Sequence, residues 1–193
     1  GFGVKPEDIS AIETLQEVDR FTGSVVANFR PLVWLNLNAT LGIDDVERHD
    51  NETIPPERVQ FSDLPEGQRT SNRAEVTTYT ANANATASYS LTDELYASTS
   101  FGGQYNEEEF RQTGAFGARL LAGTGSLSGV NARFAVDEDN TEVRTVGLYA
   151  QQQLTWRDRV YLTGAVRADD NSAFGQDFGL VYYPSVSLSW AID

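Results

Sequence analysis

The residue types that nucleophilic catalysis most often uses are scarce in this 193-residue chain. The chain contains no cysteine and a single histidine, His49, which lies in an acidic stretch. A Ser-His-Asp arrangement would have to use His49, and the lack of cysteine excludes thiol nucleophiles and disulfides. We therefore expect no enzymatic activity and identify no catalytic residue.

Carboxylates are plentiful, but their spacing does not indicate a site. They form short runs at Asp44-Asp45, Glu107-Glu108-Glu109 and Asp169-Asp170, whereas a glycosidase needs two carboxylates at a defined separation in a cleft. Alternate positions in Val136–Glu142 offer Asp137, Asp139 and Thr141, faintly like the start of a calcium loop, without the glycine and distal glutamate of an EF-hand. We predict no metal site and no cofactor.

Aromatic residues toward the expected loops could stack on a sugar or a peptide, with Arg167, Asp169 and Asn171 below them. Packing of loops explains the same residues, so the sequence predicts no particular ligand-binding site and leaves the ligand unknown. The aromatic candidates are Phe116, Phe134, Phe174, Phe178, Tyr182 and Tyr183.

The net charge of the chain argues against nucleic acid as a partner. The net charge is −14, with 28 acidic against 14 basic residues, and nucleic-acid binding needs a basic face. No apolar run is long enough for a transmembrane helix. The chain begins at Gly1 without methionine, so we expect a segment of a longer chain or a mature chain after removal of a signal peptide.

The stretch from Ala81 to Phe101 shows the dominant pattern. Apolar and polar residues alternate along it, which predicts strands with two unlike faces. The polar face carries Asn, Ser and Thr, and no Lys or Arg occurs between Arg73 and Arg111. Small polar groups of this kind suit a watery or protein-filled lumen, while the apolar face suits lipid.

This alternation recurs and predicts seven strands. Residues 7–20 are ambiguous between a short helix and an upward extension of the first strand. The expected strands cover 21–30, 34–44, 76–90, 95–110, 142–156, 160–170 and 183–192.

The connections alternate between short and long. Tight turns are expected near Pro31–Val33, Thr92–Glu94 and Arg157–Arg159, and long loops at 45–75, 111–141 and 171–182. Outer-membrane barrels have this asymmetry of short periplasmic turns and long extracellular loops. We therefore predict an all-β fold: an antiparallel up-and-down meander that forms an incomplete transmembrane β-barrel of about seven strands.

Aromatic residues flank each tight turn, which agrees with the belt of aromatics at a membrane interface. A second belt is expected about ten residues higher. The lower set is Phe29, Trp34, Tyr89, Tyr96, Trp156, Tyr161 and Trp190, and the upper set is Tyr79, Phe101, Tyr105, Tyr182 and Tyr183.

Three segments carry a resemblance to a known family. Residues 20–44, 147–175 and 182–190, above all the run QQQLTWRDRVYLTGAVRADDNSAFG, resemble the mid-barrel region of SusC/RagA-type TonB-dependent outer-membrane transporters. The resemblance implies a wide barrel with a plug domain, energised through TonB and covered by a SusD-like surface lipoprotein. It implies import of glycans, peptides or other large nutrients across the outer membrane.

Under this interpretation, residues 1–193 form part of the barrel domain, as mid-barrel hairpins without a plug domain or barrel closure. The chain would contribute barrel wall and extracellular loops, in contact with outer-membrane lipid and with the nutrient ligand. Two alternatives stay open: an ungated porin-like barrel, and a soluble secreted β-sandwich that binds carbohydrate. The nutrient, the full strand count and the parent's plug cannot be read from these residues.

Overall fold

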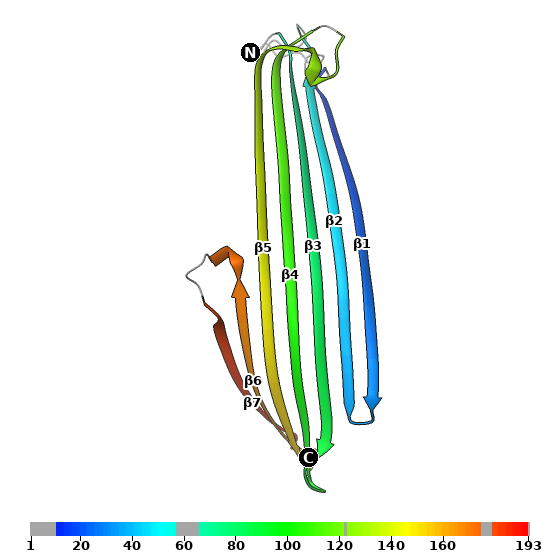
Figure 1. Cartoon of the computed structure of the whole chain (residues 1–193), viewed down its shortest axis with the longest axis vertical. Coiled ribbons are helices and arrows are strands. Elements are labelled where there is room, and N and C mark those ends of the chain that lie inside the picture. The colour runs from blue at the N-terminus through cyan, green and yellow to red at the C-terminus, as the bar shows by residue number, and fades with distance from the viewer. Residues whose placement is uncertain (1–10, 57–65, 122, 175–178, 193) are drawn as a thin grey trace. The chain divides into compact units, whose positions relative to one another are not determined.

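A computed structural model describes residues 11–56, 66–121, 123–174 and 179–192. These residues form one seven-stranded sheet in which neighbours in the sheet are neighbours in the chain (Figure 1). The predicted up-and-down meander is therefore confirmed. Its elements are β1 (Glu13–Leu32), β2 (Leu35–Ile54), β3 (Gln68–Ser90), β4 (Leu95–Leu120), β5 (Val130–Trp156), β6 (Val160–Asn171) and β7 (Val181–Trp190), with the 3-10 turns η1 (Leu127–Gly129) and η2 (Ser172–Phe174).

The chain divides into two compact units, which we describe separately. We call the first the loop-proximal unit and the second, which contains the tight turns, the turn-proximal unit. The loop-proximal unit comprises Gly1–Phe21, Asp45–Thr77 and Glu109–Thr141, and the turn-proximal unit comprises Thr22–Asp44, Thr78–Glu108 and Glu142–Asp193. In the described part of the chain, no helix is long and apolar enough to cross a membrane.

The tight turns of the turn-proximal unit lie at the predicted places or within two residues of them, because β1 includes Pro31 and Leu32. β1 and β2 are joined through Val33-Trp34, and β5 and β6 through residues 157–159. Arg157 and Asp158 have positive φ angles of 50° and 56°, and Arg159 N donates to Trp156 O at 3.0 Å. Two successive left-handed residues match the right-handed twist of the flanking strands, as in tight hairpins generally.

The register of the turn-proximal unit keeps like residues opposite each other. Leu154 pairs with Leu162, and Leu162 pairs in turn with Leu188. Because a slip of one residue would exchange the two faces, this register fixes an apolar face and a polar face. The apolar face carries the Leu, Val and Ala series, and the polar face carries the Asn, Ser, Thr and Gln series.

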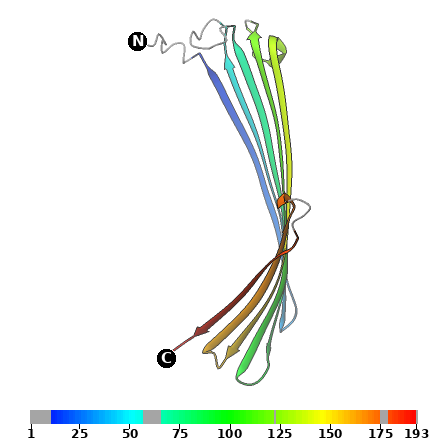
Figure 2. The ribbon, with the colours of Figure 1, turned by 90° about the vertical axis from the view of Figure 1, so that its left-hand side faces the viewer.

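The strands of the turn-proximal unit form a single layer (Figure 2). Large apolar side chains on it stay exposed: Leu148 is 58% exposed, Val186 80% and Leu188 70%. A soluble β-sandwich would bury such side chains between two sheets, and the described residues form one sheet only. The sandwich alternative is therefore not supported.

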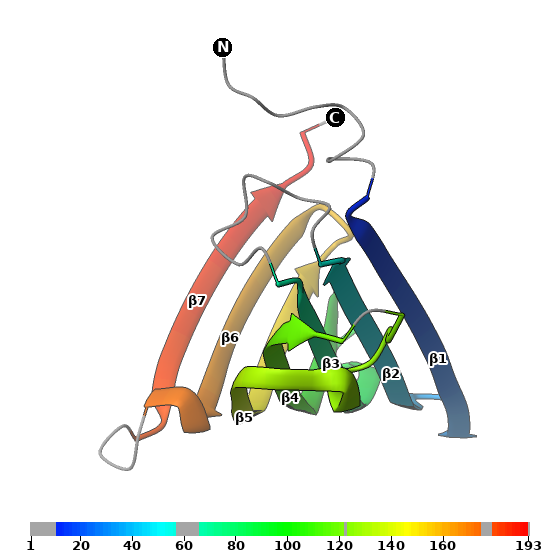
Figure 3. The same ribbon diagram turned by 90° about the horizontal axis from the view of Figure 1, so that it is seen from above.

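The loop-proximal unit corrects the predicted loops at 45–75 and 111–141. β2 continues to Ile54, β3 begins at Gln68, β4 continues to Leu120 and β5 begins at Val130. The prediction assigned these segments to loops because they are rich in charged residues. In the structure the charged side chains lie on strands and form ion pairs within a strand or with the neighbouring strand. The connection from β4 to β5 keeps a short irregular stretch with the turn η1 (Figure 3).

Other boundaries shift less. Residues 13–20 extend β1, which resolves the ambiguity over that part of 7–20 in favour of strand, while 7–10 lie outside the described residues. β7 runs from Val181 to Trp190, beginning and ending two residues earlier than predicted. The predicted connection at 171–182 agrees with η2, and residues 175–178 within it lie outside the described part.

Candidate functional site

The apolar face of the turn-proximal unit ends at a boundary of charge. On β4 it runs from Leu95 to Tyr105, and the next position on that face is Glu107. On β5 it runs from Trp156 back to Val146, and the next position is Arg144. A tilted transmembrane strand needs ~9–11 residues, which is about the length of these two apolar segments.

Side-chain contacts connect β4 and β5 at this boundary. Arg144 Nε lies 3.0 Å from Glu107 Oε1, and the Tyr105 hydroxyl donates to Glu107 Oε2 at 2.5 Å. Tyr105 thus presents its ring to the apolar side and its hydroxyl to the charged side, which is how amphipathic rings sit at a membrane interface. The predicted upper aromatic position at Tyr105 therefore agrees with the structure.

Not every predicted belt residue lies on the apolar face. Tyr161 pairs with Thr155 on the polar face, and Tyr96 alternates with Leu95 and Ala97 so that it lies on the polar face too. The prediction counted aromatics by their distance from a turn, and the faces follow from period two. Two of the predicted belt residues near the tight turns, Tyr89 of β3 and Trp156 of β5, do lie on the apolar face.

A small polar cluster interrupts the apolar face. Thr99 Oγ1 donates to Gln152 Oε1 at 2.6 Å, and the Tyr89 hydroxyl lies 3.0 Å from the same Thr99 oxygen. Gln152 Nε2 donates to the carbonyl oxygens of Ser98 and Gln153, at 3.3 and 3.1 Å. The amide is therefore satisfied within the sheet, as a polar group facing hydrocarbon must be.

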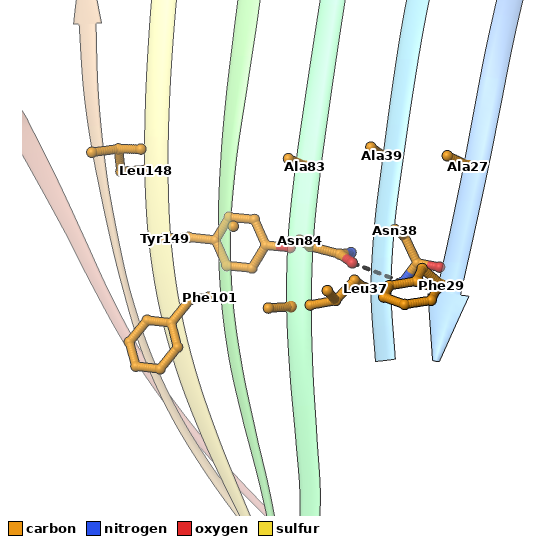
Figure 4. Close-up of a pocket in the computed structure, with 12 residues that line it drawn as sticks. Ala27, Phe29, Leu37, Asn38, Ala39, Ala83, Asn84, Phe101, Leu148 and Tyr149 are labelled. Atoms are coloured by element: carbon orange, nitrogen blue, oxygen red, sulfur yellow. Dashed lines mark hydrogen bonds between the residues drawn. The ribbon is translucent and has the colours of Figure 1, made fainter. Parts of the chain in front are cut away.

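The apolar face also bears a shallow groove of ≈ 640 Å³. Its centre is formed by small side chains, those of Ala27, Ala39 and Ala83, while larger apolar groups border it (Figure 4). The bordering residues include Phe29, Leu37, Phe101 and Leu148. The groove has the chemistry of a surface that meets hydrocarbon, with no titratable side chain among its lining residues other than Tyr149.

On the polar face, side-chain hydrogen bonds run between adjacent strands. Asn38 Nδ2 on β2 donates to Asn84 Oδ1 on β3 at 2.8 Å (Figure 4), and the hydroxyls of Thr86 and Ser100 lie 3.0 Å apart. Such cross-strand pairs stabilise a sheet. They also leave amide and hydroxyl groups available for whatever fills the polar side.

Tyr149 projects from β5 over Gly102 of β4. A Cβ on Gly102 would lie 2.4 Å from the Tyr149 ring, so the ring occupies the space that a side chain would need. Beyond it, Arg167 bonds Asp169 at 2.8 Å and donates to Gln104 at 3.1 Å. Gly102 therefore leaves room for the Tyr149 ring.

Two tight turns are joined by an ion pair. Arg157 donates from Nε and Nη2 to the two carboxylate oxygens of Glu94, at 2.9 and 2.8 Å. The guanidinium also lies 4.9 Å from the centre of the Trp156 ring, a cation–π distance. The hydrogen bonds from Arg157 hold the pKa of Glu94 below its ordinary value.

The residues considered for catalysis and metal binding are placed on strands. His49 lies on β2, with Nε2 2.7 Å from Glu47 Oε1, and Glu47 also pairs with Arg73. Asp137 and Asp139 lie on β5, so the segment is a strand, and the faint likeness to a calcium loop is not upheld.

The aromatic ligand candidates are divided between the two units. Phe116 and Phe134 belong to the loop-proximal unit and Tyr182 and Tyr183 to the turn-proximal unit. Tyr183 pairs with Arg167, whereas Tyr182 pairs with Ala168 on the opposite face. The side chain of Phe174 and the whole of Phe178 lie outside what the structure describes.

This sheet geometry defines a class: a segment of a transmembrane β-barrel wall. The family model described as TonB dependent receptor-like, beta-barrel, matches residues 10–193, so the chain belongs to that family. No curated protein sequence matches the chain.

Solved structures agree on the fold. The chain resembles the RagAB peptide transporter with a TM-score of 0.87 and 17% identity, over 96% of this chain and 22% of that one. It resembles the RagAB peptide importer in its "open-open" state with a TM-score of 0.81 and 18% identity, over 96% and 21%. The siderophore receptor PiuA from Acinetobacter baumannii matches with a TM-score of 0.52 and 12% identity, over 90% and 29%.

The chain therefore spans about a fifth of the length of the RagAB chains that it matches. The resemblance to TonB-dependent transporters seen in the sequence is confirmed by the family match. The likeness to RagAB lies in the fold.

Proposed function

We propose that this chain forms part of the wall of an outer-membrane TonB-dependent nutrient importer. The observation that carries the proposal is the apolar face between Leu95 and Tyr105 on β4 and between Val146 and Trp156 on β5. On this face Phe101 is 59% exposed and Leu148 58%. The face has the length of a membrane-spanning strand and is followed by the Glu107–Arg144 pair. Outer-membrane lipid covers that face in this proposal.

The polar face then lines the lumen, where amides and hydroxyls meet water or a plug domain. In the full-length protein, TonB supplies the energy for opening, and a SusD-like surface lipoprotein is the expected partner. RagAB is described as a peptide transporter and PiuA as a siderophore receptor. The family match supports energy-coupled import over an ungated porin, and the nutrient of this protein is addressed below.

Nitroxide labels in the full-length protein in lipid vesicles test the orientation of the faces. Labels at Leu148 and Leu162 on the apolar face should collide with oxygen dissolved in the bilayer and resist water-soluble quenchers. Labels at Gln151 and Thr163, on the polar face of the same strands, serve as matched controls and should show the reverse. Equal accessibility of the two sets to water-soluble quenchers would refute the proposal.

Energy coupling requires a separate measurement. Uptake of a nutrient mixture by cells that carry the full-length protein should disappear when TonB is deleted and return when it is supplied. Uptake that persists without TonB would instead indicate the porin alternative.

A further inference from the structure

The loop-proximal unit contains a polar groove of ≈ 410 Å³ that crosses three strands. Its two sides come from β1 and β3 and its middle from β2, so it is formed by the sheet itself and not by a connection. The lining residues are Thr14, Gln16, Arg48, Asp50, Glu52, Thr70 and Asn72.

The middle of the groove is held by a fixed ion pair. Arg48 Nε lies 2.7 Å from Asp50 Oδ2, and Gln16 Nε2 on β1 donates to Asp50 Oδ1 at 2.7 Å. Both carboxylate oxygens of Asp50 are therefore engaged, and the charge of Arg48 is balanced. Hydrogen bonds from Arg48 and then from Gln16 lower the pKa of Asp50, which stays charged at neutral pH.

The negative charge of Glu52 has no partner in the groove. It is half-buried on β2, and among the described residues no hydrogen bond or ion pair joins it. Its neighbours along the lining are hydroxyl and amide groups, which carry no charge. The groove therefore has one more negative than positive charge, and the excess resides on one side chain.

This chemistry selects a class of ligand. A half-buried carboxylate without a partner favours a cationic hydrogen-bond donor, because charge-assisted bonds are the strong ones. Thr14, Thr70 and Asn72 can satisfy the amide groups of a backbone. Among the described residues that line the groove there is no aromatic ring to provide a stacking surface. Arg48 is already paired with Asp50 and offers no free cation for an anionic ligand.

We infer that the groove binds a basic peptide, with the ammonium group of a lysine side chain on Glu52. This inference rests on the proposed function, because it assigns a nutrient class to the same wall. The bound lysine neutralises the charge of Glu52 and leaves the Arg48–Asp50 pair intact.

Calorimetric titration of the full-length protein in detergent tests the inference. The probe is a decapeptide of Gly, Ser and Asn that also carries two lysines and no acidic side chain, and its partner is the same peptide with both lysines acetylated. The lysine peptide should bind, and Glu52→Gln should weaken it about tenfold or more, since a hydrogen bond to a charged group is lost. The acetylated peptide should bind weakly and be unaffected by the substitution.

Glu13→Gln is the matched control. Glu13 is exposed on β1 beside Thr14 and points to the opposite side of the strand, so its removal changes net charge equally without touching the groove. It should leave the affinity for the lysine peptide unchanged. Glu52→Asp, which keeps the charge, should retain part of the affinity.

Several results would overturn the inference: equal affinity for the two peptides, an unchanged affinity in Glu52→Gln, or equal losses in Glu52→Gln and Glu13→Gln. If Glu52→Gln does not insert, a salt titration of the unaltered protein decides, because affinity for the lysine peptide alone should fall with salt. TonB-dependent uptake that continues while the lysine peptide fails to bind would sink this inference alone, whereas TonB-independent uptake would sink the proposed function.

Discussion

Glu94 and Arg157 join the β3–β4 turn to the β5–β6 turn through two side-chain hydrogen bonds of 2.8 and 2.9 Å. A backbone bond from Arg157 N to Glu94 O at 2.8 Å accompanies them. The left-handed φ of Arg157 is thus combined with a bidentate contact to a neighbouring hairpin. In the proposed orientation, this clamp lies on the periplasmic side of the barrel.

Removal of the Glu94–Arg157 contact should lower the stability of the barrel by a small, measurable amount. Exposed ion pairs contribute little, so Glu94→Gln should lower the melting temperature of the full-length barrel by about 2 °C or less. Asp93→Asn, one residue earlier in the same turn, removes the same charge without an Arg157 contact and should change nothing. Heat-modifiable migration on gels measures both, and an equal shift in the two variants would show that charge, not the contact, matters.

The tight turns illustrate what the sequence could predict. Alternation over Ala81–Phe101 identified the strands and their faces, because period two depends only on local geometry. The extent of β2 to β5 could not be predicted, since the charges on them are compensated by residues that are distant in sequence. Arg73 of β3, for example, pairs with Glu47 of β2, a contact that depends on the register of the two strands.

The candidate sites, like the strand ends, depend on contacts between residues that are distant in sequence. His49 Nε2 lies 2.7 Å from Glu47 Oε1, a contact that the composition of the chain did not predict. The polar groove was missed because Gln16, Asp50 and Asn72 come from three strands. The repeated spacing of Arg48, Asp50 and Glu52 at alternate positions was the available signal, and it was assigned to a loop.

A bulkier residue at position 102 should displace the Tyr149 ring. Gly102→Ala places a Cβ where the ring lies, so the ring must move away, at a cost of about 1 kcal/mol, the lower end for overpacking. The same substitution in a Tyr149→Ala background should cost much less. Unfolding of the four proteins in a double-mutant cycle measures the difference, and additive effects would show that the two residues do not compete for space.

The Thr99–Gln152 pair should behave as a unit in lipid. Thr99→Val removes the donor to Gln152 Oε1 and should destabilise the barrel by about 1 kcal/mol, because an acceptor facing hydrocarbon loses its partner. The double substitution Thr99→Val with Gln152→Leu should restore stability, since neither polar group remains. Urea unfolding in vesicles provides the measurement, and a double variant weaker than Thr99→Val would contradict the assignment of this face to lipid.

Acid should loosen the loop-proximal part of β2 and β3. Hydrogen bonding from His49, with a further contribution from Arg73, lowers the pKa of Glu47 below its ordinary value, and hydrogen bonds from Arg48 and then from Gln16 lower the pKa of Asp50 in the same way. A lowered folded-state pKa gives stability that is present above the ordinary value and is lost as pH falls through the lowered one. Amide exchange, corrected for its intrinsic rate, should therefore quicken in residues 45–54 and 68–77 between pH 5 and pH 3. Glu47→Gln together with Asp50→Asn should reduce this pH dependence, and an undiminished dependence in that variant would assign the acid response to other groups.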